Sequence, residues 1–220
     1  MKSLIAFSFL FLSFFSFSQD KETVNYSFDY FSTYSYQEDE ADKNQFTEIN
    51  FSNSSNTNYH LTFQIEKNGK TSANLYDFEN KVVFNFKDAD LNSIKENTFL
   101  KESNFIKMNF ESWIKNVSEN YYEVQYKDSI VEIVRYKNRN KKRIINNCIL
   151  KFEESKIVEN QLYNVSFIRN PLWCQKFTIK YDGILKESYF IKKNKKINIR
   201  KLIEIKKSNL NINIDLEKSS

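Results

Sequence analysis

The sequence is short of the residues that most catalytic and cofactor sites require: it has two Gly, one Pro, two Cys and one His in 220 residues. With only Gly69 and Gly183, it cannot form a Gly-rich phosphate-binding loop, which excludes the common nucleotide-dependent enzymes. It also has no G-x-S-x-G motif for a hydrolase nucleophile. We therefore expect no cofactor and no catalytic residues, and interpret the chain as more consistent with a non-enzyme.

The single histidine, His60, is the residue that a Ser-His-Asp or Cys-His mechanism would have to use. It alternates with Tyr59, Leu61 and Phe63, which places it on the polar face of a predicted strand. A general base or a metal ligand at this position would need distant partners that the sequence does not reveal. We therefore interpret His60 as a surface residue of a sheet.

The two cysteines, Cys148 and Cys174, lack the close spacing and the neighbouring His residues of a zinc site. Two readings remain, a disulfide and a pair of buried free thiols. The oxidising environment of an exported protein favours the disulfide, which would close a loop of about 25 residues and contribute about 3 kcal/mol. We therefore predict a Cys148–Cys174 bridge.

The start of the chain has the layout of a secretory signal peptide. Lys2 supplies a positive charge, residues 4–17 form an uncharged run rich in Phe and Leu, and small residues stand at Ser16 and Ser18. The run is about half the ~20 residues that a membrane-spanning helix needs. We predict a leader over residues 1–18, cleaved between Ser18 and Gln19, and no transmembrane segment in the mature chain. Because Gln19 is not Cys, no lipid attachment is expected there.

This leader resembles those of exported proteins of Gram-negative bacteria. The resemblance covers only the first tenth of the chain and implies a location rather than an activity. We expect a periplasmic, outer-membrane-associated or extracellular protein, and export argues against a nucleic acid as partner.

Period-two alternation dominates residues 19–220 and predicts a single domain of the all-β class, mainly antiparallel. A clear example is residues 59–65, followed by Asn68-Gly69, a dipeptide typical of a type I′ hairpin turn. Residues 88–104 and 111–120 break the alternation and predict one or two short helices. About a dozen strands are expected, at 24–30, 46–51, 58–66, 71–78, 82–86, 106–110, 122–126, 130–136, 143–152, 163–167, 177–181, 184–192, 197–205 and 210–216.

Strands that bury one face need a covering layer, and two arrangements satisfy this requirement. One is a curved sheet or partly open barrel, and the other is a two-layer sandwich. Periodicity alone does not distinguish them.

The two halves of the chain carry opposite charge. Residues 20–100 contain 7 Lys/Arg and 14 Asp/Glu, whereas residues 101–220 contain 25 Lys/Arg and 14 Asp/Glu. Acidic and basic strands could pair across the sheet, or the basic C-terminal half could face an anionic envelope component such as a lipid head group or an acidic polysaccharide.

Acidic runs at 38–42 and 88–90 lack the spacing of a calcium loop, so no metal site is predicted.

The sequence therefore predicts an exported, non-catalytic binding or cell-envelope-associated protein whose ligand the residues do not name. One alternative is a carrier that holds a lipid-like ligand in the concave face of a curved sheet. A second alternative is a hydrolase that uses two carboxylates. The candidate lining residues of the carrier are Phe28, Tyr30, Phe63 and Phe84.

Overall fold

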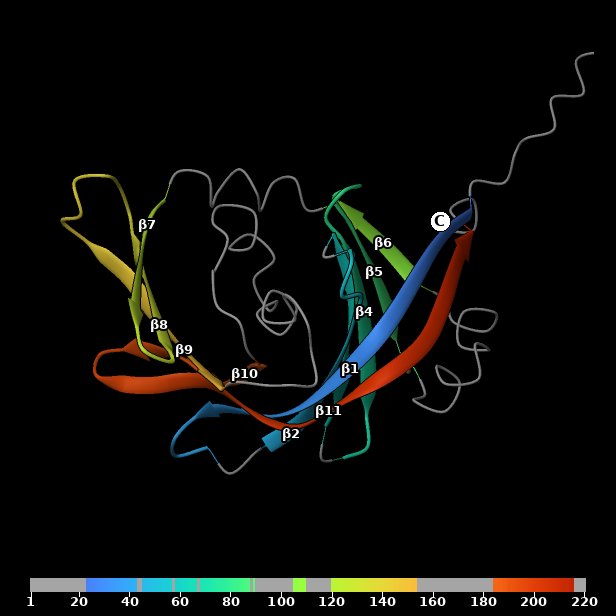
Figure 1. Cartoon of the computed structure of the whole chain (residues 1–220), viewed down its shortest axis with the longest axis horizontal. Helices are drawn as coiled ribbons and strands as arrows, with labels where there is room; N and C mark the ends of the chain where they lie inside the picture. The colour runs from blue at the N-terminus through green and yellow to red at the C-terminus, as the bar shows by residue number, and fades with distance from the viewer. Residues whose placement is uncertain are drawn as a thin grey trace, which may run out of the picture.

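The computed structural model describes residues 23–42, 45–56, 58–66, 68–87, 89, 105–109, 120–153 and 184–215. Within these ranges the regular structure consists of β-strands alone, with no helix (Figure 1). The strands are β1 (Thr23–Asp39), β2 (Gln45–Ser52), β3 (Tyr59–Ile65), β4 (Thr71–Asp77), β5 (Val82–Lys87), β6 (Phe105–Asn109), β7 (Tyr121–Lys127), β8 (Ile130–Tyr136), β9 (Ile144–Glu153), β10 (Ile184–Lys192) and β11 (Lys195–Asp215).

All the strands belong to one antiparallel sheet, in the order β6-β5-β4-β3-β2-β1-β11-β10-β9-β8-β7. The first and the last of the described strands, β1 and β11, are therefore neighbours at the centre of the sheet. Their pairing runs from Thr23 opposite Asp215 to Asp39 opposite Ile197. On each side of this pair, the remaining strands follow one another as a meander, so every other pair of neighbouring strands is also consecutive in the order of the described strands.

The sheet is strongly curved and does not close. In Figure 1, β7 to β9 rise on the left of the molecule, β2 lies at the bottom, and β4 to β6 rise on the right, where the upper parts of β1 and β11 also lie. Register shifts between Phe28 and Tyr30 and between Thr33 and Tyr34 lie in the central pair. Such bulges let a long strand bend. The all-β, antiparallel prediction is thus confirmed, and of the two arrangements that periodicity left open the described residues form the curved, open sheet.

The prediction of two separate strands at 197–205 and 210–216 was wrong, because one continuous strand, β11, runs from Lys195 to Asp215. Lys206 to Asn209 are polar, but β1 pairs with β11 on both sides of Ser208 and Asn209. A register shift accommodates one extra residue of β11 here, because Leu210 pairs with Phe28 and Lys207 pairs with Tyr30. The expected helices, apart from Ala89 and Asn120, and the expected strands at 163–167 and 177–181 lie outside the described residues.

The hairpin predicted at Asn68-Gly69 is present, with a different turn. Of the described turn residues Asn68 and Gly69, only Gly69 has a positive φ, of 79°, and its N–H donates to the Glu66 carbonyl at 2.9 Å. A type I′ turn centred on Asn68-Gly69 would require a positive φ at both residues, so the turn is of another type. The two-residue type I′ geometry occurs instead between β10 and β11, where Lys193 and Asn194 have φ of 49° and 62°.

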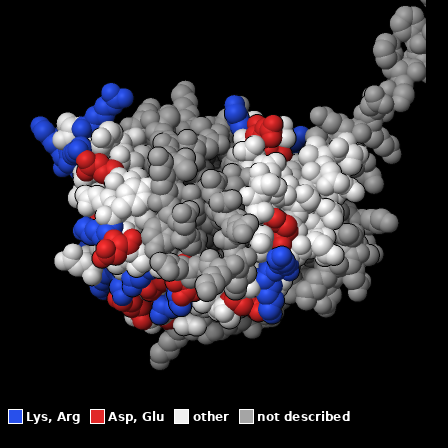
Figure 2. All heavy atoms as spheres, viewed as in Figure 1, with Lys and Arg blue, Asp and Glu red and all other residues white. Residues whose placement is uncertain are grey.

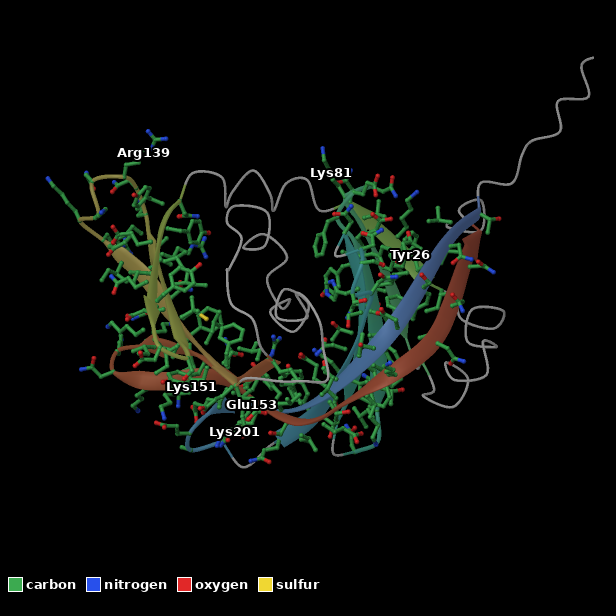
Figure 3. All side chains as sticks on the ribbon, viewed as in Figure 1. Tyr26, Lys81, Arg139, Lys151, Glu153 and Lys201 are labelled. Atoms are coloured by element: carbon green, nitrogen blue, oxygen red, sulfur yellow. The ribbon has the colours of Figure 1, made fainter. Side chains whose placement is uncertain are left out.

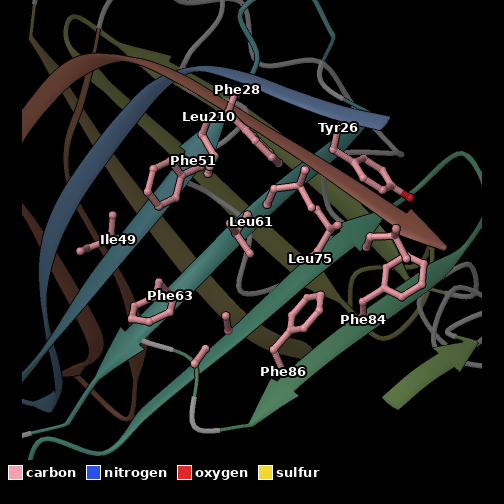
Figure 4. Packing of buried hydrophobic residues seen from close by; sticks show 14 residues of the cluster. Tyr26, Phe28, Ile49, Phe51, Leu61, Phe63, Leu75, Phe84, Phe86 and Leu210 are labelled. Atoms are coloured by element: carbon pink, nitrogen blue, oxygen red, sulfur yellow. The ribbon is translucent and has the colours of Figure 1, made fainter. Parts of the chain in front are cut away.

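The main hydrophobic core lies inside the curl of the N-terminal half (Figure 4). The rings of Tyr26 on β1 and Phe84 on β5 are 6.4 Å apart although their strands are not neighbours, so the sheet folds over on itself here. The fully buried Phe63 and Phe84 confirm two of the predicted apolar positions. The buried cluster comprises Tyr26, Phe28, Ile49, Phe51, Leu61, Phe63, Ala73, Leu75, Phe84, Phe86, Ala89, Leu210, Ile212 and Ile214.

The apolar face changes sides along the sheet. One cross-strand row runs from Val131 through Leu150, Ser188 and Arg200 to Tyr36. Paired residues point to the same side of a sheet, so buried Val131 and Leu150 share a side with Tyr36. On that same side, the N-terminal half carries polar residues, in the row Ser32, Asn50, Thr62, Asn74 and Asn85.

Candidate functional site

The most distinctive surface of the described residues is a group of cationic side chains at one end of the sheet. The β8–β9 turn spans 137–143, and the β10–β11 turn consists of Lys193 and Asn194. Because β9 lies between β8 and β10, the two turns project from neighbouring strand ends. We define the basic rim as the exposed residues Lys137, Arg139, Lys142, Arg143, Lys192, Lys193 and Lys195.

None of the seven rim residues forms an ion pair with a described carboxylate. Figure 2 shows Lys and Arg gathered at the end of the molecule where Figure 1 places the β8–β9 turn. Figure 3 shows Arg139 at the tip of this turn, directed away from the sheet. Cations that are not neutralised by neighbours produce a local positive potential, which attracts anions.

An acidic turn adjoins the rim on one flank. Asp39 at the end of β1 pairs with Ile197 near the start of β11, so the β1–β2 turn lies beside the β10–β11 turn. The end of β1 carries Glu38 and Asp39, and the turn itself carries Glu40 and Asp42. The ion pair between Lys196 and Glu40, at 3.2 Å, joins this acidic region to β11. Positive and negative charge are therefore segregated along this end of the sheet.

The ion pairs show how far the two oppositely charged halves neutralise each other. Among the described residues, only Lys196–Glu40 and Arg200–Glu48 link the acidic N-terminal half to the basic C-terminal half. The others lie within the C-terminal half: Lys127–Glu132, Lys141–Glu123, Lys151–Glu187, Lys186–Glu153 and Lys206–Glu204. Cross-sheet pairing of the halves accounts for a small part of the charge asymmetry in this region.

The β8–β9 turn is fixed by its own hydrogen bonds. The Lys137 N–H donates to the Arg143 carbonyl at 2.9 Å, and Lys141 has a positive φ of 58°. Lys141 also binds the Glu123 carboxylate, and the Tyr136 hydroxyl donates to that carboxylate at 2.9 Å. These contacts lower the pKa of Glu123, chiefly through Lys141, and raise the pKa of Lys141 through the same partner.

Large apolar side chains are exposed immediately beside the rim. Ile144 is 59% exposed and Ile145 is 41% exposed, and both follow Arg143 directly. Ile144 pairs with Tyr136, which in turn pairs with Tyr121. A register shift at this point leaves Ile145 outside the pairing. The end of the sheet thus combines cations with exposed aliphatic and half-buried aromatic groups.

A second polar cluster is buried and connects three strands of the sheet. Arg200 Nη2 lies 3.3 Å from Glu48 Oε2, with side chains only 6% and 1% exposed. Asn50 Nδ2 donates to Glu48 Oε1 at 3.2 Å, and Thr62 Oγ1 donates to Asn50 Oδ1 at 2.9 Å. The chain of contacts connects β11, β2 and β3. Its groups are engaged with one another, which suits a structural role better than acid–base chemistry.

The prediction that His60 lies on the surface was wrong. Its side chain is fully buried and stacks on Tyr76 and Phe78, with ring centroids 4.7 and 5.4 Å away. The reason is that both sides of the N-terminal sheet contain buried residues, as Thr62 on the same side also shows. Polar alternation therefore did not indicate exposure here.

Cys148 is the only predicted site residue that the described structure contains. It is buried and has no disulfide partner among these residues, and burial raises the pKa of its thiol. Cys174, Ser18 and Gln19 lie outside the described residues, so the bridge and the leader cleavage stay predictions. No group of three His, Cys, Asp or Glu in the described ranges is arranged to hold a metal ion.

The four candidate lining residues of a lipid carrier differ in their burial. Phe28, Phe63 and Phe84 belong to the buried core, where they pack against other side chains of the same cluster. Tyr30 is half-buried and lies outside that cluster. Three of the four aromatic rings thus contribute to packing of the main core.

Comparison with known proteins gives no relative: no family model, curated protein or solved structure matches the chain. In the part of the chain that the structure describes, no helix is both long and apolar enough to cross a membrane. The basic runs were visible in the sequence, but their placement at neighbouring strand ends was not, because it depends on which strands are neighbours.

Proposed function

We propose that the protein is an exported, non-catalytic binding protein of the cell envelope, and that the basic rim is its contact surface for an anionic envelope component. The observation that carries this proposal is the rim itself, with seven exposed cations and no described carboxylate paired to any of them. Unneutralised charge of one sign increases the rate of encounter with a partner of opposite sign.

Export is supported by the sequence of residues 1–18, through Lys2, the apolar run at 4–17 and the small residues before Gln19. It places the protein in the periplasm, at the outer membrane or outside the cell. In this environment the Cys148–Cys174 bridge is expected to form. Intact-mass measurement of the exported protein before and after reduction tests both points: a chain beginning at Met1, or two free thiols, would contradict them.

The buried carboxylates favour binding over hydrolysis. Glu48 is paired with Arg200, and Asp77 accepts hydrogen bonds from the Tyr26 hydroxyl at 2.7 Å and the Asn80 N–H at 2.8 Å. Each carboxylate thus links strands that are not neighbours in the sheet, and Asp77 also fixes the turn after β4. Glycoside hydrolysis instead requires two carboxylates that face a common cleft about 5 to 10 Å apart.

The test is retention of the exported protein on immobilised dextran sulfate, a soluble polyanion. The rim variant carries Lys142→Glu, Arg143→Glu and Lys193→Glu. The control variant carries Lys70→Glu, Lys107→Glu and Lys207→Glu, three exposed lysines outside the rim, so both variants have the same net charge. We expect the rim variant to elute at much lower salt than the control. Equal elution of the two variants would refute the assignment of the rim.

A further inference from the structure

We propose that the basic rim and the exposed isoleucines beside it dock the protein on an anionic lipid surface. This inference rests on the proposed function and specifies the partner: phosphate-bearing lipid head groups at a membrane rather than a soluble polyanion. The juxtaposition that carries it is Arg143 followed directly by Ile144 and Ile145, at the base of the most basic turn of the described chain.

The charge of the rim suits a lipid head-group layer. Its cations come from two turns on neighbouring strand ends, so they spread over a surface instead of converging on one point. A spread of cations matches a plane of phosphates, and each Lys or Arg close to such a plane adds to the attraction. The attraction falls as salt rises, because the screening length is only about 10 Å at 0.1 M.

The exposed isoleucines favour a membrane over a soluble polyanion as the partner. An acidic polysaccharide in water offers no apolar phase in which Ile144 and Ile145 would be stabilised. A membrane interface does offer one, and proteins that lie on it typically combine Lys and Arg with exposed aliphatic or aromatic side chains. Tyr136 and Tyr121, which follow Ile144 across the sheet, are of the residue type that is favoured at the level of the head groups.

The turn is held in place before it meets a partner. Glu123 binds Lys141 and Tyr136, the Lys137 N–H donates to the Arg143 carbonyl, and the Lys142 N–H donates to Asn140 Oδ1 at 3.2 Å. A preformed turn loses little conformational entropy on docking. Lys141, at φ 58°, is also a non-glycine residue in the left-handed region, which occurs mainly where the surroundings enforce it.

The acidic turn gives the docked molecule an orientation. Glu38, Asp39 and Glu40 lie next to the start of β11, at one flank of the rim. The phosphates that attract the rim would repel these carboxylates. The β8–β9 side of this end therefore approaches the lipid, and the β1–β2 side points away from it. This arrangement agrees with the position of Ile144 and Ile145, which also lie on the β8–β9 side.

The experiment is co-sedimentation of the exported protein with two kinds of vesicle. One is pure phosphatidylcholine, and the other is phosphatidylcholine mixed with phosphatidylglycerol in equal parts. We expect binding to the anionic vesicles only. The rim variant should bind them at least about tenfold more weakly, whereas the control variant should bind like the wild type.

A second variant, Ile144→Ser with Ile145→Ser, tests the apolar contact without changing the charge. Both side chains are exposed, so folding should be preserved, which thermal unfolding checks. We expect about tenfold weaker binding to the anionic vesicles and unchanged retention on dextran sulfate. Vesicle binding equal to that of the wild type would overturn the role of these isoleucines.

The remaining outcomes separate this inference from the proposed function. Retention of the wild type on dextran sulfate, with no binding to anionic vesicles, would overturn the lipid inference and leave the proposed function standing. Failure to bind either material would overturn both. Equal binding to neutral and anionic vesicles would also overturn the inference, because the rim would then contribute nothing.

Discussion

At the scale of residues, Glu48 and Arg200 form a buried ion pair that joins the two halves of the sheet. Their strands, β2 and β11, are separated by β1, so this ion pair reaches across a strand rather than along it. Removal of charge from water is costly, and a buried ion pair is stable only when its geometry and hydrogen bonds compensate for that cost. Asn50, which donates to Glu48, supplies one of those bonds.

Removing one partner of this pair should destabilise the protein strongly. We expect Arg200→Met to lower the free energy of unfolding by about 3 kcal/mol or more, because it leaves the Glu48 carboxylate buried without its cation. Adding Glu48→Gln to this variant should recover part of the loss. Urea unfolding of the single and double variants measures both effects. A double variant that is less stable than Arg200→Met would contradict the account.

Tyr26 gives a prediction that depends on pH. Burial, followed by the hydrogen bond to Asp77, raises the pKa of its hydroxyl. A raised pKa in the folded state means that the stabilisation is full below the unfolded pKa of about 10 and declines above it. Tyr26→Phe should therefore lower the free energy of unfolding by about 1 to 2 kcal/mol at neutral pH.

The difference between wild type and Tyr26→Phe should then narrow as the pH rises above about 10, because only the wild type loses this contribution. Chemical unfolding at a series of pH values measures it. A difference that widens with rising pH would show that the hydroxyl is not held in its protonated form by the fold.

At the scale of elements, β11 shows which parts of the fold could be predicted. Leu210, Ile212 and Ile214 alternate as expected and enter the main core. The preceding polar segment, 206–209, was predicted to interrupt the strand, because local propensity carries no information about β1 at the other end of the chain. Pairing with a distant strand outweighed the local preference.

The same strand contains a matched pair of substitutions. Ile212 is 3% exposed and packs in the core, whereas Ile203 is 61% exposed. We expect Ile212→Ala to lower the free energy of unfolding by about 2 to 4 kcal/mol, through lost burial and the cavity that it leaves. Ile203→Ala should change it by less than about 0.5 kcal/mol. Similar losses for the two variants, measured by urea unfolding, would contradict the assigned core.

Hairpins were the most predictable elements, since their pairing is local. Residues 59–65 alternate as expected, and Leu61 and Phe63 are buried in the core. His60 shows the limit of the same pattern. It has the polar alternation of an exposed residue, yet it is buried, because the sequence does not say whether the second side of a sheet is covered.

At the scale of the whole molecule, topology creates the candidate site. The C-terminal meander brings β8 to β11 side by side. As a result, two basic runs that are about fifty residues apart in the chain, 137–143 and 192–195, lie at neighbouring strand ends. The sequence predicted the charge of each run and the possibility of an anionic partner. It did not predict that the acidic turn after β1 would lie beside them, since this follows from the pairing of β1 with β11.

The central claim is that the basic rim holds the exported protein at the cell envelope. Fractionation of cells that express the wild type, the rim variant or the control variant tests it most directly. The account predicts that wild type and control sediment with the envelope at low salt and are released by high salt, whereas the rim variant is already soluble at low salt. Sedimentation of the rim variant together with the wild type at low salt would contradict the claim.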